Sequence, residues 1–77
     1  MDEPKANQIY KHYKNKYYKI IICGTHTETL ERYVIYQSLY NDEKYGNNAI
    51  WIRPLSMFLE NIIINNQSIK RFELINT

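Results

Sequence analysis

The sequence contains little cysteine, proline or glycine, and its shortages exclude several classes of protein. The single cysteine, Cys23, excludes an internal disulfide, and no Cys/His spacing supplies the four ligands of a structural zinc site. Apolar runs such as 20–23 are far shorter than the roughly 18 residues that a membrane-spanning helix needs. The N-terminus is polar and acidic rather than signal-like. We therefore expect a soluble cytoplasmic protein that does not associate with membranes.

The length of the chain limits the number of domains and the size of the core. We expect 77 residues to form one domain, 1–77, in which 1–8 are a flexible N-terminal segment. Below about 70 to 80 residues a single core seldom supplies more than about 3–5 kcal/mol, so a ligand or homo-oligomerisation is expected to help. The formal net charge of +2 is too small to indicate a polyanionic partner by itself.

Eight tyrosines and many isoleucines favour β-strands over helices. We predict a mainly β domain, a small SH3-like antiparallel barrel of five to six strands with one short helical turn. An open α+β roll is the alternative. Closing the sheet would remove the edges that apolar strands otherwise expose. The expected strands are 9–13, 17–24, 32–40, 49–53, 61–65 and 69–75, with a hairpin loop at 41–48, a short helix at 54–60 and a closing hairpin made by the last two strands.

A polar stretch, 25–31, separates two of the predicted strands. Thr25 followed three residues later by Glu28 fits a capping box, whereas Leu30 is the only apolar residue before Tyr33. This pattern predicts a single helical turn or a tight loop rather than a full helix.

An ordered set of short motifs gives the chain a family resemblance. The segments "YKHYK", "YKII", "HTETLE", "VIYQSLY", "WIRPLSMFLE" and "RFELI" follow one another between about Tyr10 and Ile75. In this combination the sequence resembles the small bacterial and phage family known as domain of unknown function 1653. The resemblance implies a stand-alone domain of this length and no established activity.

Arg53 is the charged residue that most suggests a ligand. On a strand, Trp51 and Arg53 share one face, and one of Tyr36 and Gln37 on the preceding strand must share it too. A guanidinium beside an aromatic ring can stack a base and bind a phosphate, and Gln37 can read the edge of a base. The alternative is an internal ion pair of Arg53 with Glu28 or Glu31.

The polar loop is expected to complete a ligand pocket against this strand surface. His26, Glu28 and Thr29 would line it, with Glu28 accepting hydrogen bonds. His26 and Glu28 resemble an acid/base pair, but no activated nucleophile accompanies them, so we do not expect an enzyme. His12 and His26 alone leave most of a metal's coordination shell empty, and we expect no metal and no cofactor.

A second set of residues is typical of surfaces that bind single-stranded nucleic acid. Tyrosines alternate with lysines near the N-terminus, which pairs stacking rings with phosphate-binding charges. Strand alternation argues for caution, because half of these rings would face the core. The candidates are Tyr13, Lys14, Lys16, Tyr17 and Lys19.

Together these features predict a non-enzymatic binding module for an anionic aromatic ligand. The ligand class is a nucleotide, a nucleotide-derived signal that a phage protein would sequester, or a short single-stranded nucleic acid. The alternative is a protein-interaction or homodimerisation module with no small-molecule ligand. Cys23, beside Gly24 at the end of an apolar run, is expected to be a buried structural thiol.

Overall fold

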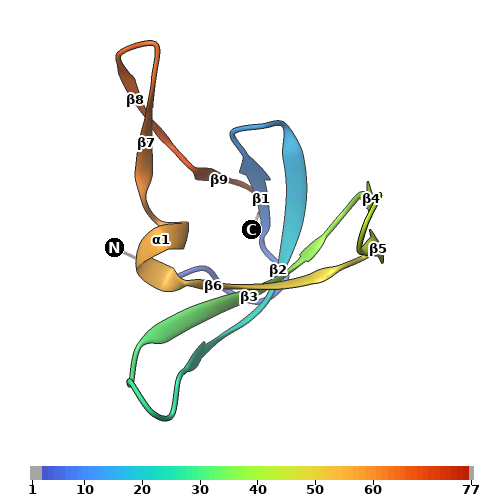
Figure 1. Ribbon diagram of the computed structural model, residues 1–77, viewed down its shortest axis with the longest axis vertical. Coiled ribbons are helices and arrows are strands. Elements are labelled where there is room, and N and C mark those ends of the chain that lie inside the picture. Colours follow the sequence, from blue (N-terminus) through green and yellow to red (C-terminus); the bar gives the residue numbers. More distant parts are fainter. Residues whose placement is uncertain (1–2, 77) are drawn as a thin grey trace.

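Antiparallel strands joined in chain order build the fold, which a computed structural model describes over residues 3–76 (Figure 1). The elements are β1 (Ile9–His12), β2 (Lys16–Thr25), β3 (Arg32–Ser38), β4 (Asn41–Asp42), β5 (Gly46–Asn47), β6 (Ile50–Pro54), α1 (Leu55–Phe58), β7 (Asn61–Ile64), β8 (Gln67–Lys70) and β9 (Phe72–Asn76). Five strands form one sheet in the order β6-β3-β2-β1-β9. The hairpins β4–β5 and β7–β8 make separate two-stranded sheets.

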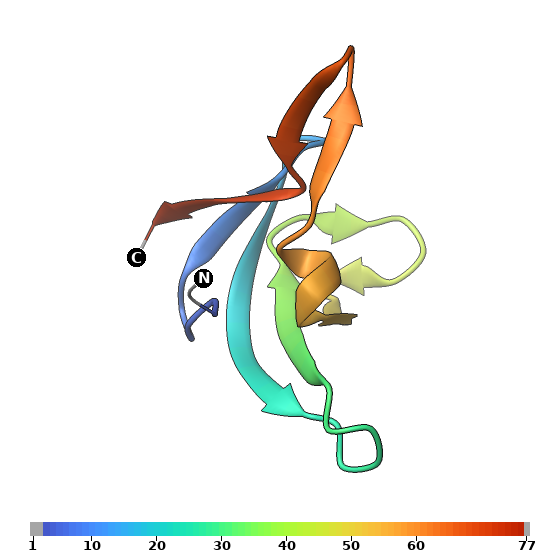
Figure 2. The same cartoon turned by 90° about the vertical axis from the view of Figure 1, so that its left-hand side faces the viewer.

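This architecture confirms the prediction of a small, mainly β domain with one short helical turn. The sheet stays open, because no strand pairing in residues 3–76 joins its two edge strands, β6 and β9. Hairpin β7–β8 projects beyond one end of the sheet, and the loop between β2 and β3 projects beyond the other (Figures 1 and 2).

The last predicted strand, 69–75, is wrong as a single element. The strand is interrupted at Arg71. Residues up to Lys70 belong to β8 and pair with β7, whereas β9 starts at Phe72 and pairs with β1. Leaving the hairpin at this point lets β9 become the fifth strand of the main sheet, which buries Phe72 to 4% exposure.

Asparagine and glycine make the tight turns. Asn15 between β1 and β2, Asn65 and Asn66 between β7 and β8, and Gly46 at the start of β5 all have positive φ. Asparagine and glycine tolerate this left-handed region better than other residues. The abundance of asparagine in the sequence thus has a structural use.

The core lies on one face of the main sheet, which we call the inner face. Alternation along β3 buries Val34, Tyr36 and Ser38, and the residues paired with them on neighbouring strands face the same way. Most of the core is aromatic, so ring contacts at centroid distances of 4.1 to 5.8 Å hold it together. Its buried hydrophobic residues are Tyr10, Tyr18, Ile20, Val34, Tyr36, Phe58 and Phe72.

Helix α1 covers part of the inner face, and its sequence explains how. Phe58 is 1% exposed and its ring stacks on that of Phe72 at 4.1 Å, while Leu55 and Leu59 pack against the same core. The predicted short helix is therefore confirmed, and Leu55, Phe58 and Leu59 lie at helical spacing on its buried side. The helix begins one residue later than the predicted 54, and Pro54 is its N-cap. No helix within residues 3–76 has the length and apolarity of a membrane span.

The N-terminal segment runs alongside the sheet. Asn7 N–H donates to the carbonyl of Ile20, Ile20 N–H donates to the carbonyl of Gln8, and Pro4 is buried. Residues 3–8 of the predicted flexible segment thus contact the fold, and residues 1–2 lie outside the described part of the chain.

Candidate functional site

The pairing of β3 with β6 brings three of the predicted ligand residues onto the inner face. Trp51 lies opposite Tyr36, and Arg53 lies opposite Val34, whose side chain is completely buried. Directly paired residues project to the same face of a sheet, so the prediction that Trp51 and Arg53 share a face is confirmed.

Arg53 packs against two aromatic residues of the core. Its Nε donates a hydrogen bond of 3.1 Å to the hydroxyl of Tyr36, and its guanidinium carbon is 5.5 Å from the centre of the Phe72 ring. The ion pairs formed within residues 3–76 are Arg32–Glu3 and Arg71–Glu60. The alternative ion pair between Arg53 and the loop carboxylates is therefore absent from the described structure.

Two further basic residues, His12 and Arg71, lie on the same side of the site, and neither was predicted from the sequence as a ligand residue. Arg71 directly precedes Phe72, over whose ring the Arg53 guanidinium lies, and both arginines are near enough to His12 to lower its pKa. His12 lies opposite Phe72 across the β1–β9 pair, with 4.9 Å between the ring centres. Burial, reinforced by the positive charges of Arg53, Arg71 and Lys14, holds the pKa of His12 below its usual value. Arg53 and Arg71 make this end of the inner face cationic, whereas the lowered pKa of His12 favours its neutral form.

Aromatic side chains form the other end of this site. The indole of Trp51 donates a 3.4 Å hydrogen bond to Ser38 Oγ, and the ring of Tyr45 meets it edge-on at 5.2 Å. Tyr45 is 57% exposed and belongs to the β4–β5 hairpin. The carboxylate of Asp42 accepts hydrogen bonds from the backbone of Lys44 and Tyr45, which fixes this turn and lowers the pKa of Asp42.

Tyr36 contributes a hydroxyl rather than a stacking surface. Its ring is 4% exposed and is enclosed by the rings of Tyr18, Phe58 and Phe72. Of the two aromatic residues predicted to stack a ligand, the half-buried Trp51 keeps that possibility, and Tyr36 orients Arg53.

Gln37 lies on the opposite face of the sheet, which we call the outer face. It pairs with Lys19 on β2 and Ile50 on β6, and its side-chain nitrogen donates a 3.5 Å hydrogen bond to the carbonyl of Asn48. The prediction that Gln37 joins Arg53 in one pocket is therefore wrong, because neighbouring strand residues project to opposite faces.

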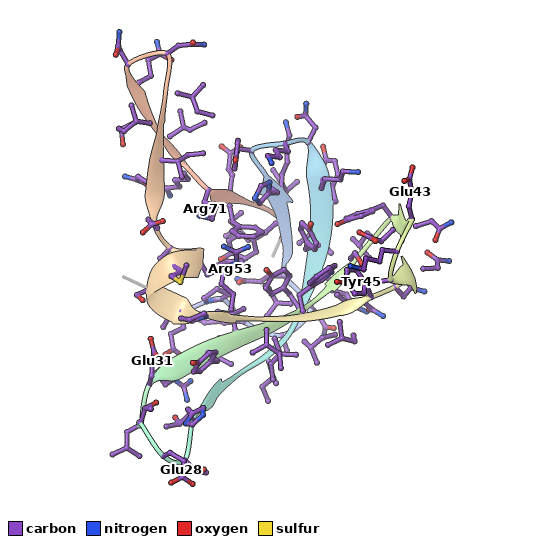
Figure 3. The ribbon with its side chains drawn as sticks, in the orientation of Figure 1. Glu28, Glu31, Glu43, Tyr45, Arg53 and Arg71 are labelled. Carbon is purple, nitrogen blue, oxygen red and sulfur yellow. The ribbon has the colours of Figure 1, made fainter. Side chains whose placement is uncertain are left out.

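The predicted cleft between the polar loop and Arg53 is not formed. The β2–β3 pairing continues to Thr25 and Arg32, so the loop leaves the sheet as an extension of the hairpin, with Glu28 near its tip (Figure 3). His26 Nδ1 accepts the backbone N–H groups of Glu28 and Thr29, which makes the loop a tight turn. That outcome confirms the tight-loop alternative but separates these residues from Arg53.

His26 instead contributes to a shallow hollow on the outer face. This hollow has a volume of about 270 Å³, and its lining includes Tyr33, Ile35 and Ile52. Thr29 Oγ1 accepts the backbone N–H of Glu31, so the Thr29 hydroxyl also has a role within the loop. Structural hydrogen bonds within the loop thus account for the side chains of His26 and Thr29.

The five predicted nucleic-acid residues are divided between two faces. Tyr17 and Lys19 project from the outer face, as alternation with the buried Tyr18 requires. Lys16 Nζ lies 4.5 Å from the centre of the Tyr40 ring.

The remaining two residues of that set belong to the turn after β1. Lys14 Nζ lies 5.7 Å from the ring centre of Tyr13, which is half-buried beside His12. Two of the three lysines therefore contact tyrosines of their own chain, and the structure does not place the set on one continuous surface.

Cys23 has the surroundings of a structural thiol. It packs against the core, its sulfur donates to the carbonyl of Pro4 at 3.3 Å, and partial burial raises its pKa. Across residues 3–76, no group of three or more His, Cys, Asp or Glu side chains is placed to hold a metal.

Comparisons with known proteins support both the fold and the family. A crystal structure of a DUF1653 protein from Bordetella bronchiseptica is similar with a TM-score of 0.81 and 24% identity, over 97% of this chain and 90% of that one. The comparison with curated proteins found no match. A family model described as "Protein of unknown function (DUF1653)" matches residues 8–74. The chain therefore belongs to the DUF1653 family, as its ordered motifs indicated.

Proposed function

We propose that this protein is a non-enzymatic binding module whose ligand is a nucleotide or a related anionic molecule with an aromatic ring. Arg53 would hold the anionic group on the inner face, and Trp51 with Tyr45 would contact the ring. A cytoplasmic location, where nucleotides are abundant, suits this proposal. The observation that carries it is the environment of Arg53, which lacks a carboxylate partner within residues 3–76.

Charges that lose water are normally paired, because desolvation of an unpaired charge is costly. Arg53 is half-buried, and within residues 3–76 its guanidinium contacts the neutral hydroxyl of Tyr36 and the ring of Phe72, and no carboxylate pairs with it. Both contacts orient the guanidinium without neutralising it. A bound anion would supply the missing charge through the short, paired hydrogen bonds that guanidinium groups make with phosphate.

The arrangement of the site favours a ligand with two chemically different ends. Arg53 and Arg71 supply positive charge beside His12, whereas Trp51 lies nearer the start of β6 and the exposed Tyr45 lies in the β4–β5 hairpin. Stacking of a base on an aromatic residue is worth about 1–3 kcal/mol. A nucleoside monophosphate has both features that such a site selects, a ring and a dianionic group.

The proposal includes no chemical step. The acid/base pair considered from the sequence, His26 and Glu28, lies in the β2–β3 loop, where His26 Nδ1 already accepts two backbone N–H groups. A general base needs a free lone pair within hydrogen-bond reach of the proton that it removes. We therefore favour binding or sequestration of an intact ligand.

The test is a calorimetric titration of the folded protein with AMP, adenosine and ribose 5-phosphate. We expect AMP to bind most tightly, and we expect Arg53→Gln to abolish its binding while the protein remains folded. Arg32→Gln is the matched control, since it removes the same charge from a residue that is paired with Glu3. Equal binding of AMP by wild type and Arg53→Gln would refute the proposal.

A second candidate, self-association, is favoured by the outer face. Ile22, Ile35 and Ile52 form a row across β2, β3 and β6, and Ile22 and Ile52 are 56% and 66% exposed. The row ends at β6, an edge strand, so pairing of two copies along β6 would join their rows. Sedimentation at rising protein concentration tests this candidate. A dimer that Ile52→Lys dissociates would support it, and a monomer at all concentrations would refute it.

A further inference from the structure

Arg71 occupies a fixed position beside the proposed site. It is the residue between β8 and β9, and its backbone is bonded on both sides. Its N–H donates to the carbonyl of Glu60 at 3.1 Å, and its carbonyl accepts the N–H of Tyr13 at 3.0 Å. The base of the side chain is therefore held between the end of the α1 region and the turn that follows β1.

The guanidinium of Arg71 has spare hydrogen-bonding capacity. Its Nη2 donates to Glu60 Oε1 at 2.7 Å, but its Nε is buried and has no partner in the described structure. Guanidinium groups carry five N–H donors, and a buried donor without an acceptor is unfavourable. An acceptor that reached Nε would satisfy it.

Arg53 and Arg71 act on one shared neighbour. The charged groups that influence His12 are Arg53 from β6, Arg71 from the β8–β9 junction and Lys14 from its own turn. All of them are positive. In the view of Figure 3 the two labelled side chains lie near each other, and Arg53 lies 5.5 Å from the ring centre of Phe72, the residue that follows Arg71.

We propose that Arg53 and Arg71 together hold a phosphate group of the ligand, and that Glu60 is an internal competitor which leaves Arg71 when the phosphate binds. This inference rests on the proposed function and assigns its anionic subsite. Glu60 is suited to the role of a displaceable partner. Its side chain is 49% exposed, and it supplies one oxygen to Arg71 in an ion pair of a kind that contributes little to stability.

The chemistry favours phosphate over a carboxylate ligand. Exchange of Glu60 for another carboxylate would replace one singly charged group by an equivalent one, so little would be gained. A phosphate monoester carries close to two negative charges at neutral pH and offers three acceptor oxygens. It can therefore bridge two guanidinium groups, which a carboxylate bound by one of them does less well.

The experiment compares inorganic phosphate and AMP as probes of wild type, Glu60→Gln and Glu73→Gln. Glu60→Gln removes the competitor, and we expect it to tighten the binding of both probes about two- to five-fold, the range that a weak ion pair allows. Glu73→Gln is the matched control: it makes the same charge change on β9, at an exposed residue opposite Lys11. We expect no tightening from it.

A direct readout accompanies the affinities. In nitrogen-15 NMR spectra of wild type, added phosphate should shift the Nε–H signals of Arg53 and Arg71 together, with one saturation curve. Arg71→Lys keeps the charge but removes Nε, so we expect weaker binding of both probes. Circular dichroism of each variant establishes that it is folded before its affinity is compared.

The outcomes separate this inference from the proposed function. AMP binding that depends on Arg53 but is unchanged in Glu60→Gln and Arg71→Lys would overturn the phosphate bridge and leave the proposed function standing. Phosphate binding that Glu60→Gln tightens, with AMP no tighter than phosphate, would support the bridge and refute an aromatic ligand. If neither probe binds wild type or Glu60→Gln, both are overturned.

Discussion

Truncation of Phe58 tests the packing on which the inner-face site depends. Phe58 is the buried residue of α1, with its ring against those of Tyr10, Tyr36 and Phe72. Replacing a buried phenylalanine by alanine costs about 3–5 kcal/mol, through lost transfer free energy and the cavity that remains. Domains have about 0.05–0.15 kcal/mol of stability per residue, which gives about 4–12 kcal/mol for 77 residues. Phe58→Ala therefore removes a large part of the total.

The assay is urea unfolding followed by circular dichroism. With a slope near 2 kcal/mol/M, we expect the midpoint of Phe58→Ala to fall by about 2 M, or the variant to be unfolded without urea. Met57→Ala is the control on the same helix, because Met57 is 44% exposed and its truncation should cost less than about 0.5 kcal/mol. A loss below about 1 kcal/mol for Phe58→Ala would show that α1 does not pack on the sheet as described.

Three further predictions concern single side chains. The pKa of His12 is lowered, so between that pKa and 6.5 the unfolded chain binds a proton that the folded chain does not; the stabilisation is complete above pH 6.5 and is lost as the pH falls. Urea unfolding above and below pH 6.5 should show this loss in wild type, and an equal loss in His12→Gln would contradict it. Tyr36→Phe removes the acceptor of Arg53 and should cost about 0.5–1.5 kcal/mol of stability in the same assay, whereas Tyr17→Phe on the outer face should cost nothing measurable. Cys23 should react with a disulfide reagent more slowly in the folded protein than in urea, since its pKa is raised and its sulfur is bonded to Pro4; equal rates would refute its burial.

The strands were predictable because their signals are local. The isoleucine- and tyrosine-rich runs of β2 and β3 indicated strands, and alternation along β6 placed Trp51 and Arg53 on a common face. The spacing of Leu55, Phe58 and Leu59 likewise gave the short helix and its buried side.

The composition of the site was less predictable, because it depends on long-range pairing. Arg71 and His12 approach Arg53 through the β1–β9 pair, whose register no local pattern in the sequence specifies. Tyr45 was not predicted as a site residue because it lies in 41–48, a segment expected to be only a loop. A preference for Tyr36 over Gln37 could have come from the sequence, since an aromatic residue in a small core is buried more often than a glutamine.

In the proposed function a nucleotide binds on the inner face between Arg53 and Trp51. Trp51 is the only tryptophan of the chain, so its fluorescence reports on this site alone. Titration of the wild-type protein with AMP should quench this fluorescence saturably, and Arg53→Gln should lose the quenching while Arg32→Gln retains it. Fluorescence that does not respond to AMP, or that responds equally in Arg53→Gln, would contradict the account.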